Sequence, residues 1–161
     1  MRRLGCLLLS ILLTVSVAGC GQQAQKQENL TGTLEEIMDQ VYENAELSQE
    51  FRDAMQDFAR SEITADDAEY LIGTADIDFA EALMSTPMIN VVAYQCILIR
   101  MNDGADIEAA KEKILANADP RKWICVEAES TVVENNGNVI LFIMGDAANT
   151  AALKDSFLQL K

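Results

Sequence analysis

The chain has 161 residues, of which 50% are hydrophobic, and its 26 acidic and 12 basic side chains give a net charge of −14 at pH 7. This charge excludes a basic footprint for nucleic acid and favours a solvated, acidic surface. The sequence has no histidine, which excludes Ser-His and Cys-His nucleophile pairs and the commonest zinc ligand. It also has no glycine-rich motif for binding phosphate or a dinucleotide. We therefore expect no cofactor and no metal.

Residues 1–19 have the organisation of an export signal. Arg2 and Arg3 precede an apolar stretch, residues 7–17, which is shorter than the ~20 residues that a helix needs to cross a bilayer. The stretch ends in the sequence VAGC, residues 17–20: an aliphatic residue, two small residues and a cysteine. We therefore expect residues 1–19 to be a signal peptide that is removed.

Residues 17–20 resemble the lipobox of bacterial lipoproteins. The resemblance implies that the thiol of Cys20 receives a diacylglyceryl group and that Cys20 becomes the first residue, on the outer face of the bacterial cytoplasmic membrane. Two acyl chains give a lasting anchor, where one chain gives only marginal membrane binding. The alternative is an ordinary cleavage site beside an unrelated cysteine. Removal of residues 1–19 leaves 10 basic and 26 acidic side chains, and so a charge of −16.

The mature chain begins with a polar, glutamine-rich segment. Residues 20–32 show no hydrophobic periodicity and predict a flexible tether that carries the lipid. The remainder, residues 33–161, is long enough for one domain with its own core.

The first half of the domain predicts helices. Thr33 and Glu36 form a capping box before apolar residues at helical spacing. Ser48 can cap a second helix, in which Phe51, Met55, Phe58 and Ala59 share a face. Residues 68–73 fit either a short edge strand or a helical turn, and residues 76–84 predict a short helix that stops before Pro87.

The second half predicts strands that alternate with helices. The apolar run 90–101 predicts a strand covered on both faces, and Asp106 can cap a helix that continues to about Ala118. A strand over 123–133 and its partner over 138–144 flank an Asn136-Gly137 turn, and a last helix covers 147–160. This order predicts an α+β domain with helices packed on a mainly antiparallel sheet.

The chain resembles a family of small lipoproteins of anaerobic Gram-positive bacteria that carry domain of unknown function family 4358. The resemblance covers residues 34–158 and rests on a Pro-Met entry to a strand, an apolar strand followed by "NDG", and a hairpin that ends in "GD". The chain differs from the family at three positions. The family usually has a glutamate at the position of Gln95 and no cysteine at the position of Cys96. It usually has a lysine near the position of Arg100. The family implies export and a single α+β domain, and it supplies no catalytic residue.

The cysteines of the domain, Cys96 and Cys125, form no CxxC motif. If the strand face that carries Arg100 points outward, both thiols lie on the less buried side, and a disulfide between neighbouring strands is one possibility beside two unrelated thiols. In the strand 123–132 we expect Ile124 to face the core and Trp123 to face the wetter side.

Three functions remain open from the sequence. The first is a non-catalytic binding module at the cell envelope, with an exposed aromatic surface around Trp123, Tyr94 and Arg100 that takes a protein or an envelope ligand. The second is an enzyme that acts on envelope material through carboxylates, although no pair stands out. The third is a thiol redox role for Cys96 and Cys125, which their separation in the sequence disfavours. We favour the first.

Mass spectrometry of the membrane-bound protein tests the anchor. We expect an N-terminal Cys20 that carries a diacylglyceryl group, and we expect a Cys20→Ala variant to lose the lipid and its membrane attachment because the acyl chains supply that attachment. An unmodified Cys20, or an N-terminus at another residue, contradicts the expectation.

Overall fold

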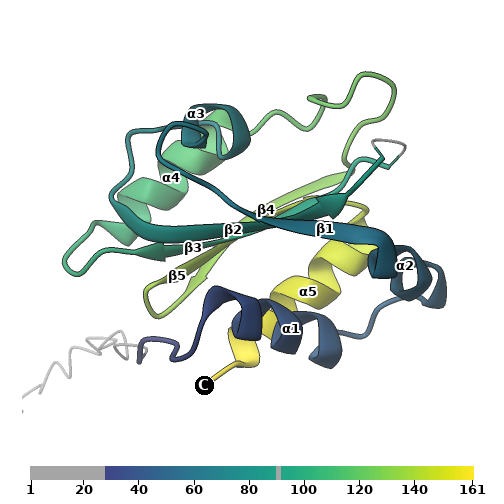
Figure 1. The fold of residues 1–161 in the computed structure, drawn as a ribbon, viewed down its shortest axis with the longest axis horizontal. Coiled ribbons are helices and arrows are strands. Elements are labelled where there is room, and N and C mark those ends of the chain that lie inside the picture. The colour runs from purple at the N-terminus through teal and green to yellow at the C-terminus, as the bar shows by residue number, and fades with distance from the viewer. Residues whose placement is uncertain (1–27, 90–91) are drawn as a thin grey trace, which may run out of the picture.

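The computed structural model describes residues 28–89 and 92–161 as one α+β domain, which confirms the predicted fold class (Figure 1). Five strands form an antiparallel sheet in the order β1-β2-β3-β5-β4. The strands are β1 Phe58–Glu62, β2 Phe79–Pro87, β3 Gln95–Met101, β4 Ser130–Asn136 and β5 Val139–Gly145. The helices are α1 Leu34–Asn44, α2 Gln49–Ala54, α3 Ala68–Leu71, α4 Ile107–Asn117 and α5 Ala147–Gln159, and a 3-10 turn, η1, covers Met55–Asp57.

The predicted signal peptide, residues 1–19, and Cys20 lie outside the described residues. In the part of the chain that the structure describes, no helix is long and apolar enough to cross a membrane. The last residues of the predicted tether pack on the domain. Leu30 is buried, and Arg100 donates from Nη1 to the carbonyl oxygen of Leu30 at 2.8 Å and from Nη2 to that of Gly32 at 2.6 Å.

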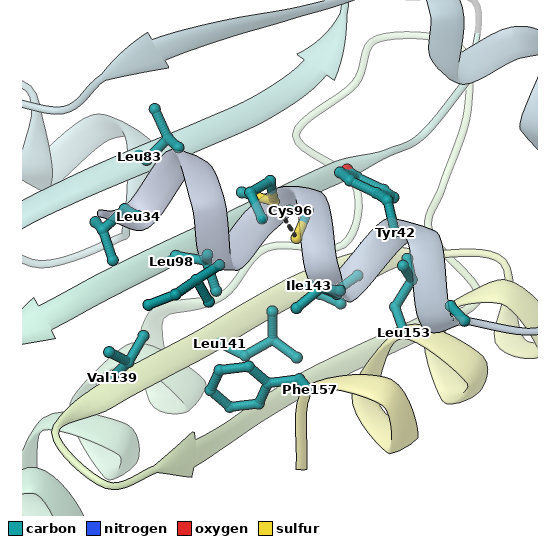
Figure 2. Close-up of a cluster of buried hydrophobic side chains, with 14 of the residues drawn as sticks. Leu34, Tyr42, Leu83, Cys96, Leu98, Val139, Leu141, Ile143, Leu153 and Phe157 are labelled. Atoms are coloured by element: carbon teal, nitrogen blue, oxygen red, sulfur yellow. Dashed lines mark hydrogen bonds between the residues drawn. The ribbon is translucent and has the colours of Figure 1, made fainter. Parts of the chain in front are cut away.

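One face of the sheet is covered by α1, α2 and α5 (Figure 1). Phe157 of α5 packs over Leu141 of β5, and Met38 of α1 accepts a hydrogen bond from the thiol of Cys96 at 3.6 Å (Figure 2). Ser156 Oγ donates to the carbonyl oxygen of Val41 at 2.8 Å, which joins α5 to α1. These contacts form the first of two hydrophobic clusters.

The opposite face is covered by α3, α4 and the segment 118–129. Ile114 of α4, Ile72 after α3 and Trp123 pack with Ile97 and Phe142 of the sheet in a second hydrophobic cluster. Both faces are therefore closed by packed elements. The helices α1, α2 and α5 cover one face, and α3 and α4 cover the other.

Local sequence signals placed the ends of several helices correctly. The capping box at Thr33 is present with both hydrogen bonds, and Ser48 and Asp106 cap α2 and α4 through their side chains. A carboxylate or hydroxyl oxygen that accepts from a free N–H at a helix start needs only residues three positions apart, so the sequence alone defines it. Residues 68–71 form a helical turn, which ends before Gly73 with φ +94°.

The predicted helix over residues 48–59 is wrong beyond Ala54. Phe58 and Ala59 begin β1, whose residues pair with the end of β2 from Phe58 opposite Pro87 to Glu62 opposite Leu83. Phe58 still packs on the first cluster, so its burial was predicted correctly and its backbone conformation was not.

The predicted helix over residues 76–84 is also wrong, because Phe79–Pro87 forms β2. β2 lies between β1 and β3, and its backbone groups are used by both neighbours. Leu83 faces the first cluster and Ala82 the second, which is the alternation of a strand. Pairing with distant strands therefore overrides the local preference of an alanine- and glutamate-containing segment.

The strand predicted over residues 123–133 begins only at Ser130. The residues before it form a loop closed by a hydrogen bond from Ala128 N to the carbonyl oxygen of Pro120 at 2.9 Å. The predicted faces are reversed there, since Trp123 is buried and Ile124 is fully exposed. The predicted strand over 90–101 is likewise shorter, with β3 beginning at Gln95.

The hairpin between β4 and β5 is confirmed, with Asn136 paired to Val139 and Gly137 at φ +57°. A Cβ atom at Gly137 would lie 2.5 Å from the carbonyl oxygen of Glu28, so only glycine fits there without movement of the backbone. Asn136 is buried, and its Nδ2 donates to the carbonyl oxygens of Phe157 at 2.9 Å and Leu160 at 3.0 Å, which ties the hairpin to the end of α5.

Replacement Asn136→Ala should lower the free energy of unfolding by about 1–3 kcal/mol, because it leaves two carbonyl groups without their donor. Chemical denaturation measures the change. Asn117→Ala is the matched control. The Asn117 amide also donates to a helix carbonyl, that of Lys113 at 2.8 Å, but Asn117 is exposed. The expected loss of unfolding free energy in this variant is below about 0.5 kcal/mol. Equal losses in the two variants would contradict this role of Asn136.

Candidate binding surface

The structure does not bring Trp123, Tyr94 and Arg100 together, so the predicted aromatic surface is wrong. Tyr94 is buried on the face covered by α1, α2 and α5, and Trp123 is buried on the other face. Arg100 lies near the far end of β3 from Tyr94. Side chains on opposite faces of a sheet cannot form one contact surface.

Tyr94 has a structural role. Its ring centroid lies 5.1 Å from those of both Phe51 and Phe58. Its hydroxyl shares a hydrogen bond of 2.8 Å with that of Tyr42. Burial raises the pKa of both phenols well above the ordinary value of 10.0, so both hydroxyls stay protonated inside the core and one donates to the other.

Arg100 also has a structural role. Its guanidinium forms an ion pair with Glu81 at 2.6 Å and holds the carbonyl groups of Leu30 and Gly32. The side chain thus joins β2, β3 and the segment before α1. With its donors directed to these three partners, Arg100 fixes the point where the chain enters the domain.

The two cysteines are free thiols that differ in their exposure to solvent. Cys96 is fully buried on the first cluster and Cys125 is exposed in the loop before β4, so the structure contains no disulfide between them. The predicted placement of Cys96 on the less buried face is wrong, because that parity of β3 faces α1 and α5. Burial raises the pKa of the Cys96 thiol to about 12, which disfavours the thiolate that redox chemistry needs.

A cavity of about 390 Å³ beside α4 gathers three carboxylates, those of Asp76, Asp78 and Asp106. Asp76 forms an ion pair with Lys113 at 2.6 Å, Asp78 accepts from Asn102 Nδ2 at 2.6 Å, and Asp106 caps α4. The Lys113 hydrogen bond and charge lower the pKa of Asp76, the direction opposite to that of a general acid. Among the described residues no three His, Cys, Asp or Glu side chains are grouped as metal ligands.

The clearest unexplained surface feature is a group of exposed apolar side chains at one end of the sheet. We call Met88, Ile89, Val92 and Ile124 the end-loop surface; they are 72%, 70%, 51% and 101% exposed. The first three lie between β2 and β3, and Ile124 lies in the loop before β4. Arg121, Glu127 and Glu129 are exposed charged residues of both signs in the same loop as Ile124.

Strand pairing places these loops at the same end of the domain. Gln95 opposes Met144, and Ser130 opposes Gly145, so β3 and β4 start where β2 and β5 finish. Figure 1 shows both loops at the right-hand end of the sheet. Ala93 and Trp123, which anchor the two loops, belong to the same hydrophobic cluster.

The end-loop surface lies opposite the point where the chain enters the domain. Arg100, which holds Leu30 and Gly32, pairs with Val139 at the other end of β3, about 17 Å from Gln95 at a strand rise of about 3.4 Å per residue. The exposed apolar residues are therefore remote from the segment that leads to Cys20.

Comparison of the chain with protein-family models, with curated proteins and with solved structures finds no match. The candidate surface therefore rests on the geometry of this chain alone.

Sequence reasoning missed the end-loop surface. The alternation of residues 123–132 predicts a strand with Ile124 in the core, whereas residues 123–129 form a loop that exposes Ile124. Met88, Ile89 and Val92 were hidden within a continuous apolar run that also contains β3. A usable signal was Pro87, the last residue of β2, since proline has no backbone N–H to donate to a strand ladder.

Thiol labelling checks the cysteine environments. In folded protein that consists of residues 28–161, one thiol should react at pH 8, because burial and a pKa of about 12 keep Cys96 protonated and inaccessible. Two thiols should react in denaturant. Cys125→Ser should remove the fast reaction; rapid labelling of that variant in its folded state would contradict the buried position of Cys96.

Proposed function

We propose that this protein is a lipid-anchored, extracytoplasmic interaction module without catalysis of its own, which binds a protein of the cell envelope through the end-loop surface. The observation that carries the proposal is the exposure of Met88, Ile89, Val92 and Ile124 at one end of the domain. Clustered exposed apolar side chains with a charged rim are typical of protein contact sites.

A protein fits this surface better than the membrane does. The apolar side chains lie at the end remote from the chain entry at Leu30 and Gly32, whereas the proposed anchor precedes that entry. The charge of −16 that remains after removal of residues 1–19 also opposes close contact with anionic lipid. An apolar contact surface on a second envelope protein satisfies both conditions.

The exported location and membership of domain of unknown function family 4358 are parts of the same proposal. They are supported by the lipobox at residues 17–20 and by the sequence patterns around β3 and the β4–β5 hairpin. The carboxylate-dependent enzyme is the less favoured alternative, because Asp76, Asp78 and Asp106 are each engaged by a structural partner in their shared cavity.

Site-specific photocrosslinking in cells that produce the protein tests the partner. A photoreactive amino acid in place of Ile89 or of Ile124 should crosslink to the same protein of one defined mass. In the variant with the photoreactive amino acid at position 124, an added Met88→Asp substitution should reduce the crosslinking yield about tenfold or more. The reason is that a carboxylate replaces apolar contact area.

Position 115 is the matched control. Leu115 is an apolar residue of α4, 55% exposed and outside the end-loop surface, so crosslinking from it should give no such product. Equal products from all three positions, or crosslinks to lipid alone from Ile89 and Ile124, would contradict the proposal.

A further inference from the structure

A second cavity, separate from the end-loop surface, lies over the sheet between α3 and the end of α4. Its volume is about 290 Å³, near the lower limit for small-molecule sites. Its floor is made by Phe142 and Met144 of β5, and its walls include Leu71 and Ile72. The rim carries the polar side chains of Glu69, Tyr70, Asp119 and Lys122.

Gln95 does not line this cavity itself, but it lies next to Met144 of the cavity floor, and its hydrogen-bonding groups are unused. It pairs with Met144 across the ladder between β3 and β5, and directly opposed residues project to the same face. Its side chain is 1% exposed, and neither Nε2 nor Oε1 has a hydrogen-bond partner among the described residues. A buried carboxamide without partners is costly and rare, so it marks a place where a polar group from outside the chain would stabilise the structure.

Lys122 supplies a cation at the same cavity. Its Nζ lies 5.6 Å from the centroid of the Trp123 ring, and among the described residues it takes part in no ion pair. Partial loss of solvent lowers the pKa of Lys122, and Asp119 opposes that change. Lys122 is exposed at the rim, so its ammonium group is accessible to a carboxylate that enters the cavity.

We propose that this cavity binds the carboxyl-terminal end of a short peptide whose last side chain is apolar. Lys122 receives the terminal carboxylate, Phe142 and Met144 receive the apolar side chain, and Gln95 exchanges hydrogen bonds with the peptide amide. An amide offers one donor and one acceptor, which is the pair that a carboxamide matches. Met144 is unbranched and flexible, and its displacement opens the way to Gln95.

The rim charges restrict the ligand further. Glu69 and Asp119 face the same space as Lys122, so a ligand with several negative charges, such as a phosphate ester, is repelled. A peptide with one carboxylate and a free amino group has no net charge and suits a rim of both signs. The small volume favours one or two residues.

Calorimetric titration of the full-length protein in detergent tests the site with the dipeptide alanyl-leucine. Saturable binding is expected, and alanyl-leucinamide, which lacks the carboxylate, should bind about tenfold or more weakly because a charge-assisted contact is lost. Lys122→Gln should weaken alanyl-leucine binding by a similar factor. Lys154→Gln on α5, at the other face of the sheet, is the matched control and should bind as the wild type does.

Gln95→Leu separates a ligand contact from a packing defect. It removes two unpartnered polar atoms, so the thermal midpoint should rise while the affinity for the dipeptide falls about tenfold. Gln56→Leu, an exposed position in η1, should change neither. Absence of saturable binding to the wild type, equal affinity for the acid and the amide, or unchanged affinity in Gln95→Leu each overturns the proposal. None of these results depends on the crosslinking partner of the end-loop surface.

Discussion

The arrangement of the domain depends on one constraint: β3 and β5 are apolar on both of their faces. Every residue of β5 is buried, as are all residues of β3 except Arg100. A strand of this kind needs a covering layer on each side, because exposure of either face leaves large apolar areas in water. The helices α1 and α5 supply one layer, and α4, α3 and the segment 118–129 supply the other.

This constraint decides where a ligand can bind. With both faces of the sheet covered, aromatic side chains such as Tyr94 and Trp123 are used in packing. The remaining surfaces lie at the ends of the sheet and where the covering elements fail to meet. The end-loop surface is of the first kind. The cavity over Phe142 and Met144, between α3, the end of α4 and Lys122, is of the second kind.

The position of the chain entry relative to the end-loop surface supports the proposed binding function. Arg100 holds the chain entry at one end of the sheet, and the apolar loops occupy the other end. An anchor at Cys20 would therefore leave the end-loop surface free to meet a second protein. Buried Cys96 and the engaged carboxylate of Asp76 make thiol or carboxylate catalysis less favourable than binding.

The sequence predicted well those features that depend on residues close together in the chain. The capping box at Thr33, the cap at Asp106 and the Asn136-Gly137 hairpin each require only a few neighbouring residues. The continuous apolar pattern of residues 90–101 correctly predicted a strand, β3, that is covered on both faces. The sequence alone also shows the absence of histidine, which excludes Ser-His and Cys-His nucleophile pairs.

Tertiary structure decided the features that depend on distant partners. Residues 79–87 form a strand because β1 and β3 both pair with them, although their local composition favours a helix. Trp123 is inside and Ile124 outside because their loop folds back over the sheet and is not part of β4. The burial of the Gln95 amide without a partner also depends on tertiary structure, in which β3 pairs with β5 and Gln95 lies opposite Met144. Local hydrogen bonds depend on residues that are close together in the sequence. Burial and strand pairing depend on contacts with distant segments, which only the packing of the whole chain determines.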